Sequence, residues 1–210
     1  MNKYKVIAIC GKSASGKDTL LRNILTNYPW LHRIINCTTR PPREGEVDGK
    51  NYHFLSLEDF AHQDAKGEMV EVAKFREWFY GTSFRDLSED EINIGVFNPA
   101  GIYALMRRDD IELYVVQVEA SAKTRLLRSL TREDNPDVDE IVRRYLADND
   151  DFAVFSQVYE PDYLFENEYG LMERAAREVV LYAQRHWAKE ANYITTKSIY
   201  SGCTKKIHYI

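Results

Sequence analysis

“KVIAICGKSASGKDTLLRNIL” (residues 5–25) joins an apolar run, a loop bounded by glycines and a segment with helical periodicity. The run at 5–10 predicts a β-strand, and the apolar spacing at 17–28 predicts a helix. Between them, Gly11, Gly16 and Lys17 have the spacing G-x-x-x-x-G-K. In this strand–loop–helix context the spacing predicts a loop that binds nucleotide phosphates. The alternative, a turn with a surface lysine, does not account for that context.

The residue types of this loop suit an anion. Gly11 and Gly16 reach backbone angles that other residues avoid, so successive N–H groups can surround a phosphate. The helix that follows directs the positive end of its dipole at the same phosphate, and Lys17 adds a mobile charge for the outer phosphates. The predicted triphosphate-binding residues are Gly11, Ser13, Ala14, Ser15, Gly16, Lys17, Asp18 and Thr19.

Asp18 departs from the usual pattern, which has Ser or Thr after the lysine. A carboxylate is a hard oxygen ligand and can replace that hydroxyl on Mg²⁺. Alternatively, Asp18 is a first-turn residue favoured by the helix dipole, and Thr19 supplies the hydroxyl. Asp18 and Thr19 are therefore the candidate metal ligands.

Outside this stretch, short apolar runs alternate with segments of helical period. The strands predicted are 5–10, 32–37, 69–75, 92–97, 113–119 and 162–165. The helices predicted are 17–28, 56–66, 99–109, 121–132, 137–158 and 170–190. Several of the strands are almost wholly apolar, which is typical of a parallel sheet with helices on both faces. The alternation predicts an α/β fold with a central parallel sheet flanked by helices.

Two segments break this alternation. Residues 36–83 contain Pro41, Pro42, several glycines and closely spaced short strands, which predicts a small, mostly β excursion from the main sheet. From Asn192 onward the chain is polar and weakly patterned, and residues 191–210 are interpreted as a tail without an assigned role.

Bulk properties favour a cytoplasmic protein. Its 210 residues suit one core domain, and a net charge of −5 gives no general attraction to nucleic acid or an anionic membrane. No apolar run approaches the roughly 18 residues that span a bilayer, and the N-terminus has the wrong flanks for a signal peptide. Three cysteines without metal-ligand spacing argue against a disulfide framework, and Cys10 and Cys37 are expected to be buried.

A second motif lies at “TTRPPREGEVDGKNYHF” (38–54). It satisfies the pattern T-[ST]-R-x-x-[KR]-x-x-[DE]-x-x-G-x-x-Y-x-F and so resembles the guanylate kinase family. The resemblance extends from about residue 4 to residue 188. The positions that carry it are Thr38, Thr39, Arg40, Arg43, Glu46, Gly49, Tyr52 and Phe54.

The chemistry of this motif suits a monophosphate. Arg40 and Arg43 place two guanidinium groups on one loop, and these groups match phosphate oxygens bidentately. Tyr52 supplies a hydroxyl, and “WFYGTS” adds Tyr80 beside Gly81. Each tyrosine alone would more simply be packing. The resemblance implies that two arginines and two tyrosines bind the phosphate of the acceptor nucleotide.

The resemblance also implies a base site, where this chain departs from the family. A Ser, a Glu and an Asp that read guanine correspond here to Asn36, Glu71 and Asn98. Glu71 can accept hydrogen bonds from guanine, whereas the amide of Asn98 is expected to bind it more weakly. The full set implied for the nucleoside monophosphate is Asn36, Arg40, Arg43, Tyr52, Glu71, Tyr80, Gly81, Thr82 and Asn98.

Arginines gather at 121–146, which resembles the lid of the family. Lid arginines stabilise charge on the transferring phosphoryl group. The alternative is a solvated, salt-bridged helix face, to which Arg125 is assigned. The catalytic residues implied are Lys17, Arg128, Arg132 and Arg144.

Together these features predict a kinase that uses ATP and Mg²⁺ to phosphorylate GMP or dGMP. Val96 stands where the family has an acidic strand residue, so we expect that this carboxylate has moved to Asp18. Such departures suit a phage or viral enzyme. The predicted organisation is one domain at 1–190, with a core (1–35 and 92–190), an acceptor flap (about 36–91) and a lid (about 121–146).

Other functions remain open at this point. A kinase for another nucleoside monophosphate fits the same motifs. A non-catalytic, guanylate kinase-like module that binds phosphopeptides would need neither the loop nor the lid. A phosphate-loop GTPase is disfavoured because no N-K-x-D motif is present. The partners expected are small-molecule nucleotides, and the chain is expected to be a monomer or a weak homodimer.

Overall fold

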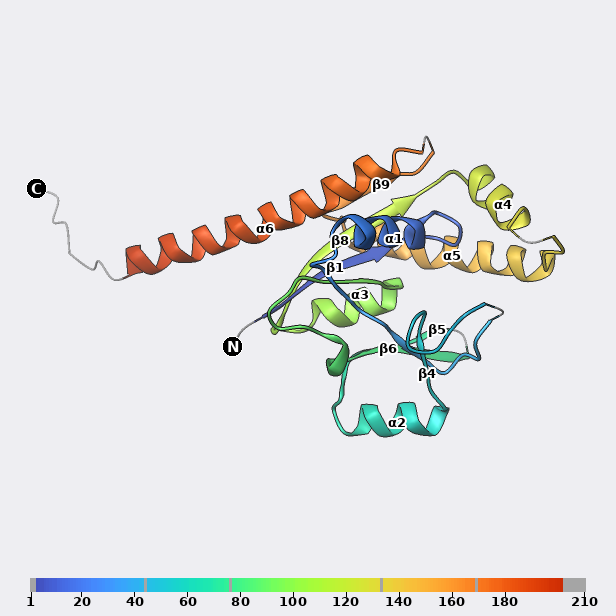
Figure 1. The fold of residues 1–210 in the computed structure, drawn as a ribbon, viewed down its shortest axis with the longest axis horizontal. Helices are drawn as coiled ribbons and strands as arrows, with labels where there is room; N and C mark the ends of the chain where they lie inside the picture. Colours follow the sequence, from blue (N-terminus) through green and yellow to red (C-terminus); the bar gives the residue numbers. More distant parts are fainter. Residues whose placement is uncertain (1–2, 44, 76, 133, 169, 202–210) are drawn as a thin grey trace, which may run out of the picture.

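The computed structural model describes residues 3–43, 45–75, 77–132, 134–168 and 170–201. Its larger sheet has five parallel strands in the order β2-β7-β1-β8-β9 (Figure 1). This sheet confirms the predicted α/β fold. The strands are β1 (Tyr4–Cys10), β2 (His32–Arg33), β7 (Asn93–Val96), β8 (Ile111–Glu119) and β9 (Tyr163–Glu166).

Helices cover both faces of this sheet, which explains its apolar strands. In β1, Ile7 and Ile9 pack into one apolar cluster, and Val6 and Ala8 pack into another on the opposite face. This alternation follows the two-residue period of a strand. The helices are α1 (Lys17–Asn27) with α6 (Met172–Ser201) on the first face, and α3 (Pro99–Met106) with α5 (Val138–Val158) on the second.

The segment around 36–83 forms a second, smaller sheet with the order β4-β3-β6-β5. Helix α2 (Leu57–Ala65) covers it, and Phe60 packs with Cys37 and Met69 in a separate apolar cluster. A short 3-10 helix, η1 (Phe84–Asp86), follows. The strands are β3 (Cys37–Thr38), β4 (His53–Phe54), β5 (Met69–Phe75) and β6 (Trp78–Ser83).

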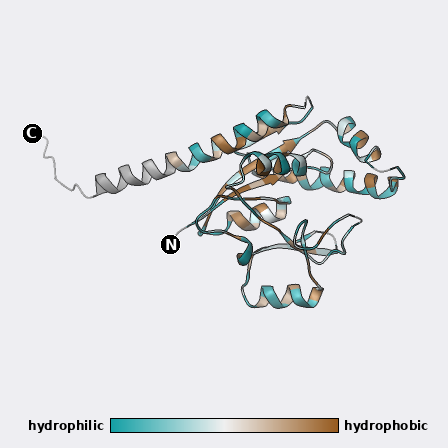
Figure 2. Cartoon of the chain, in the orientation of Figure 1, coloured by the Kyte–Doolittle hydropathy of each residue, from teal (hydrophilic) through white to brown (hydrophobic). Residues whose placement is uncertain are grey.

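Helix α4 (Ala122–Leu130) and the first part of α5 pack together beyond the carboxyl end of the main sheet (Figure 1). Both helices begin at side-chain caps: Ser121 accepts from the Thr124 N–H, and Asp137 accepts from the Glu140 N–H. Figure 2 shows the main strands in brown between helices whose outer faces are largely teal. Of the predicted lid arginines, Arg128 and Arg144 lie on these capped helices, and Arg132 lies in the turn after α4.

Three sequence-based assignments were wrong. The predicted strand 32–37 divides into β2, in the main sheet, and β3, in the smaller sheet, because the chain crosses between the sheets at 34–36. Strands β4 and β6 were not predicted as strands. Helix α6 continues to Ser201, past the predicted end at residue 190. The last predicted tail residues, 202–210, lie outside the described part of the chain.

The structure also tests two bulk expectations. Cys10 and Cys37 are free and buried, as expected, and burial raises the pKa of each thiol to about 12, so both remain protonated at neutral pH. Among the helices described, none combines the length and the apolar character that crossing a membrane requires.

Candidate active site

The predicted phosphate loop lies at the carboxyl end of β1 and leads into α1, as expected from the sequence. Three of its residues have positive φ: Gly11 at 153°, Ala14 at 59° and Gly16 at 102°. A Cβ at Gly11 would collide with the Val118 carbonyl oxygen, and one at Gly16 would collide with the Asn167 side chain. Glycine is therefore required at both positions by backbone angle and by space.

The outer side of this loop is fixed by two side chains. The amide of Asn167 donates to the Ser15 carbonyl at 2.7 Å. Arg128 donates to the Ser15 carbonyl at 3.3 Å and to the Asn167 carbonyl at 2.9 Å. Arg128, predicted as a catalytic arginine, is thus in contact with the loop backbone. Sequence reasoning missed Asn167, although its place after β9, at the carboxyl edge of the sheet, was an available signal.

Helix α5 also reaches the loop. The Asp148 carboxylate is 8% exposed and accepts a 2.5 Å hydrogen bond from the Ser13 N–H. Next to it, Asn149 accepts from Lys12 Nζ at 2.9 Å and from Arg125 at 3.2 Å. None of these contacts was predicted, because each joins residues more than twenty positions apart.

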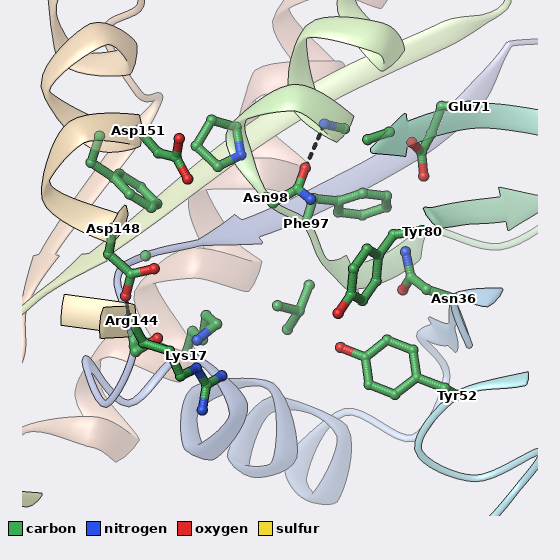
Figure 3. A pocket seen from close by; sticks show the side chains of 17 residues that line it. Lys17, Asn36, Tyr52, Glu71, Tyr80, Phe97, Asn98, Arg144, Asp148 and Asp151 are labelled. Atoms are coloured by element: carbon green, nitrogen blue, oxygen red, sulfur yellow. Dashed lines mark hydrogen bonds between the residues drawn. The ribbon is translucent and has the colours of Figure 1, made fainter. Parts of the chain in front are cut away.

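A single cavity, here called the central cavity, lies between the phosphate loop, the smaller sheet, α3 and α5 (Figure 3). Val96, Asp148 and Asp151 also line it, so it has carboxylates from α5 and an apolar residue at the end of β7. The predicted site residues that it brings together are Gly11, Ser13, Lys17, Asn36, Tyr52, Glu71, Tyr80, Asn98 and Arg144.

Glu71 is the most unusual group in the central cavity. It is 6% exposed, and its Oε1 accepts a 3.0 Å bond from Thr82, whose hydroxyl in turn accepts from the Asn36 amide at 3.2 Å. Its Oε2 is buried and has no hydrogen-bond partner among the described residues. Burial raises the pKa of this carboxyl to about 7. Glu71 therefore offers one unsatisfied acceptor to a ligand.

Asn98 is oriented by the helix that it begins. Its Oδ1 accepts the Gly101 N–H at 2.7 Å and caps α3 (Figure 3). This bond identifies the acceptor end of the amide, so the donor Nδ2 is the group that remains for a ligand. An aspartate at this position could cap the helix with one oxygen and still present a second acceptor.

Two tyrosines extend toward the centre of the cavity, and Figure 3 shows their hydroxyls on the same side. The Tyr52 and Tyr80 rings pack edge to face with centroids 6.2 Å apart. Burial, and then the charge of Asp18, raises the pKa of Tyr52 to about 12. The Tyr52 hydroxyl is therefore a hydrogen-bond donor at neutral pH.

Arg40 and Arg43, the two arginines of the motif at 38–54, lie in different surroundings. Arg40 is 7% exposed, donates to both carboxylate oxygens of Glu46 at 2.9 Å and lies over the Tyr52 ring. Arg43 instead lines a second cavity, here called the outer cavity, between the loop and the α4–α5 helices. Gly81 packs against the β5 backbone. The outer cavity also contains Arg125, Arg132 and Arg144.

Arg125 was wrongly assigned to a solvated helix face. It is 4% exposed, and its guanidinium lies over the Tyr145 ring at 4.8 Å while donating to Asn149. The aromatic ring and the amide offset part of the loss of water around the charge, while Nε and Nη1 have no hydrogen-bond partner among the described residues. Arg132, by contrast, is exposed.

Asp18 and Thr19 lie in the first turn of α1 and are exposed. The Asp18 side chain is 74% exposed, and its carboxylate is 3.7 Å from Lys17 Nζ. No group of three or more metal-binding side chains occurs among the described residues. Mg²⁺ is usually held by one or two carboxylates together with substrate phosphates.

The guanylate kinase family model matches residues 3–93, which contain the loop, the flap motif and Glu71. Residues 3–93 are similar to the guanylate kinase family. This region supplies Lys17, Tyr52, Glu71 and Tyr80 of the central cavity, and the resemblance expected from the two motifs is confirmed.

Related proteins support the same family. A guanylate kinase of Nostoc sp. is 45% identical over 78 residues, 37% of this chain and 39% of that protein. A guanylate kinase of Synechococcus sp. is 43% identical over 95 residues, 45% of this chain and 51% of that protein. The chain thus matches about half the length, or less, of these guanylate kinases.

The fold extends the likeness beyond the matched region. A guanylate kinase structure from Anaplasma phagocytophilum superposes with a TM-score of 0.61 at 20% identity, covering 89% of this chain and 87% of the other. At this identity the comparison shows the fold alone. Asn98, the α4 arginines and Asp148 all lie outside the guanylate kinase match at 3–93. Asn98 and the lid therefore fall in the part of the chain without close sequence likeness, whereas Asp18 and Asn36 fall within the match.

Proposed function

We propose that this protein is a nucleoside monophosphate kinase that transfers the γ-phosphoryl group of ATP to GMP or dGMP. It would act on soluble nucleotides in the cytoplasm, as a monomer or a weak homodimer. The observation that carries the proposal is the central cavity, which joins Lys17 of the phosphate loop to the buried acceptor Glu71 and to the hydroxyls of Tyr52 and Tyr80.

In this proposal the phosphate loop binds the donor triphosphate, and the flap binds the acceptor monophosphate. The backbone of the loop, from Gly11 to Lys17, holds the triphosphate, and Lys17 neutralises charge on the outer phosphates. In the flap, Tyr52 and Tyr80 bind the acceptor phosphate while Glu71 accepts from the guanine edge. Transfer then depends on placing the two phosphates in line, which requires little covalent chemistry from the protein.

Charge on the transferring group needs cations. Arg144 lines both cavities and is the lid arginine closest to the reaction in this proposal, with Arg132 at the rim of the outer cavity. Mg²⁺ held by Asp18 would neutralise charge shared between the phosphates. Arg128 would act indirectly, by fixing the loop backbone.

The proposal is tested by measuring ADP release with ATP and each ribo- and deoxynucleoside monophosphate in turn. GMP or dGMP should give the highest kcat/KM. A preference for AMP or a pyrimidine monophosphate would contradict the base site. No transfer to any acceptor, together with binding of a phosphopeptide, would favour the non-catalytic module.

The orientation of Asn98 leads to a prediction about base selectivity. Asn98→Asp should keep the cap on α3 and add an acceptor for the guanine 2-amino group. We expect the ratio of kcat/KM for GMP over IMP to rise about five- to tenfold, the range of one hydrogen bond. The same ratio is measured for Asn27→Asp, an exposed change at the end of α1 and outside the cavity. An unchanged ratio in Asn98→Asp would remove this residue from the base site.

A further inference from the structure

The contact between Asp148 and the phosphate loop has a function that the proposed reaction does not use. We infer that the Asp148 carboxylate occupies the anion site of the loop when nucleotide is absent, and that the donor triphosphate must displace it. The inference rests on the proposed use of this loop for a donor triphosphate. It makes Asp148 a built-in competitor of that ligand.

The first support is geometric. The Ser13 N–H belongs to the set of loop N–H groups that would surround a phosphate, and it already donates to Asp148 at 2.5 Å. A carboxylate is an anion with acceptor oxygens, so it satisfies this donor as a phosphate oxygen would. Without it the Ser13 N–H would lack a partner in a site where Asp148 itself is 8% exposed.

The second support is charge. Lys17 and Arg144 line the same cavity as Asp148, so this space holds two cationic side chains beside the carboxylate. A triphosphate brings several negative charges to the same place. Carboxylate and phosphate would then repel each other at short range, so they cannot share the Ser13 N–H.

The third support is the way α5 is attached. Asn149, the next residue, accepts from Lys12 Nζ at 2.9 Å, so two adjacent α5 side chains hold two adjacent loop residues. Arg144 is one helical turn before Asp148 and therefore on the same face of α5. Displacing Asp148 would remove one of these two attachments between the loop and the helix that carries Arg144.

The test measures binding without catalysis. Isothermal titration gives the Kd of MgATP and of inorganic tripolyphosphate for the wild type, Asp148→Asn and a control, Asp150→Asn. Asp150 is exposed on the same helix, so its replacement removes the same charge without the loop contact. We expect Asp148→Asn to bind both ligands about tenfold more tightly, about 1.4 kcal/mol, and Asp150→Asn to stay within about twofold of the wild type.

Equal or weaker binding in Asp148→Asn would overturn the inference, and weaker binding would show that the carboxylate assists the ligand. If Asp148→Asn does not fold, Asp148→Ser removes the same charge and carries the same expectation. Tighter tripolyphosphate binding without phosphoryl transfer would uphold the inference and contradict the proposed function. A wild type that binds neither ligand would contradict both.

Discussion

Glu71→Gln should lower kcat/KM for GMP about a hundredfold, equivalent to about 3 kcal/mol, the upper value for hydrogen bonds to a charged group. The reason is that the unsatisfied Oε2 of Glu71 is the buried acceptor in the base site, and an amide replaces one acceptor with a donor. Steady-state kinetics at pH 8 measure the change. Glu58→Gln, an exposed change on α2, is the control. A loss below about threefold would contradict the role of Glu71.

The same residue makes stability depend on pH. Its folded pKa of about 7 exceeds the ordinary value of 4.5, so the native state binds more protons than the unfolded state between these values. The free energy of unfolding should therefore fall as pH rises from about 4.5 to 7, by roughly 3 kcal/mol. Denaturant unfolding of Glu71→Gln should lack this pH-dependent part of the free energy of unfolding.

The same carboxyl should make GMP binding depend on pH. Hydrogen-bond donors of guanine favour the ionised form of Glu71, so the KM for GMP in the wild type should rise below pH 7.

Asp18→Ala should lower kcat about a hundredfold and leave the KM for GMP nearly unchanged. The reason is that Asp18 is the candidate Mg²⁺ ligand in the first turn of α1, whereas the base-site residues Glu71 and Asn98 line the central cavity. A Mg²⁺ titration of kcat measures the effect. If Asp18→Ala is as active as the wild type at saturating Mg²⁺, Asp18 only favours the start of α1, which is worth about 0.3–1 kcal/mol of stability.

A double substitution tests whether Asp18 replaces the acidic residue that the family has at the position of Val96. Asp18→Ser with Val96→Asp should recover more kcat than the two single changes added together, because both residues would act on one ion. Val96 is only partly buried and lines the central cavity, so a carboxylate there faces the ligand space. Thermal unfolding of the Val96→Asp single variant checks that β7 tolerates the charge.

The phosphate loop and the parallel sheet could be predicted from the sequence, because both follow from patterns within short segments. The phosphate loop was predicted because its glycines, its preceding strand and its helix are contiguous. The parallel sheet was predicted because doubly covered strands are apolar throughout. Glu71 and the tyrosines were found only through the family resemblance, since a single buried carboxylate has no periodic signal.

The assignments that were wrong depend on contacts between residues that are far apart in the sequence. The division of 32–37 into β2 and β3 follows from partners sixty and forty residues away, which no window of sequence contains. The Arg40–Glu46 pair changes the role expected of Arg40, because the shared motif does not say which groups bind each other. Arg125 was misread because its partners, Tyr145 and Asn149, come from another helix.

Helix α5 is continuous for 21 residues, although its two halves have different surroundings. Phe152 and Phe155 fix its second half in the core, while Val142 and Leu146 of its first half are exposed. From Asp148 to Val138 the helix extends about 15 Å at 1.5 Å per residue. A tilt of about 10° at the buried half would therefore move Val138 by about 3 Å. Because the second half of α5 is held in the core, a small displacement of the helix at Asp148, beside the phosphate loop, would produce a larger displacement at Val138.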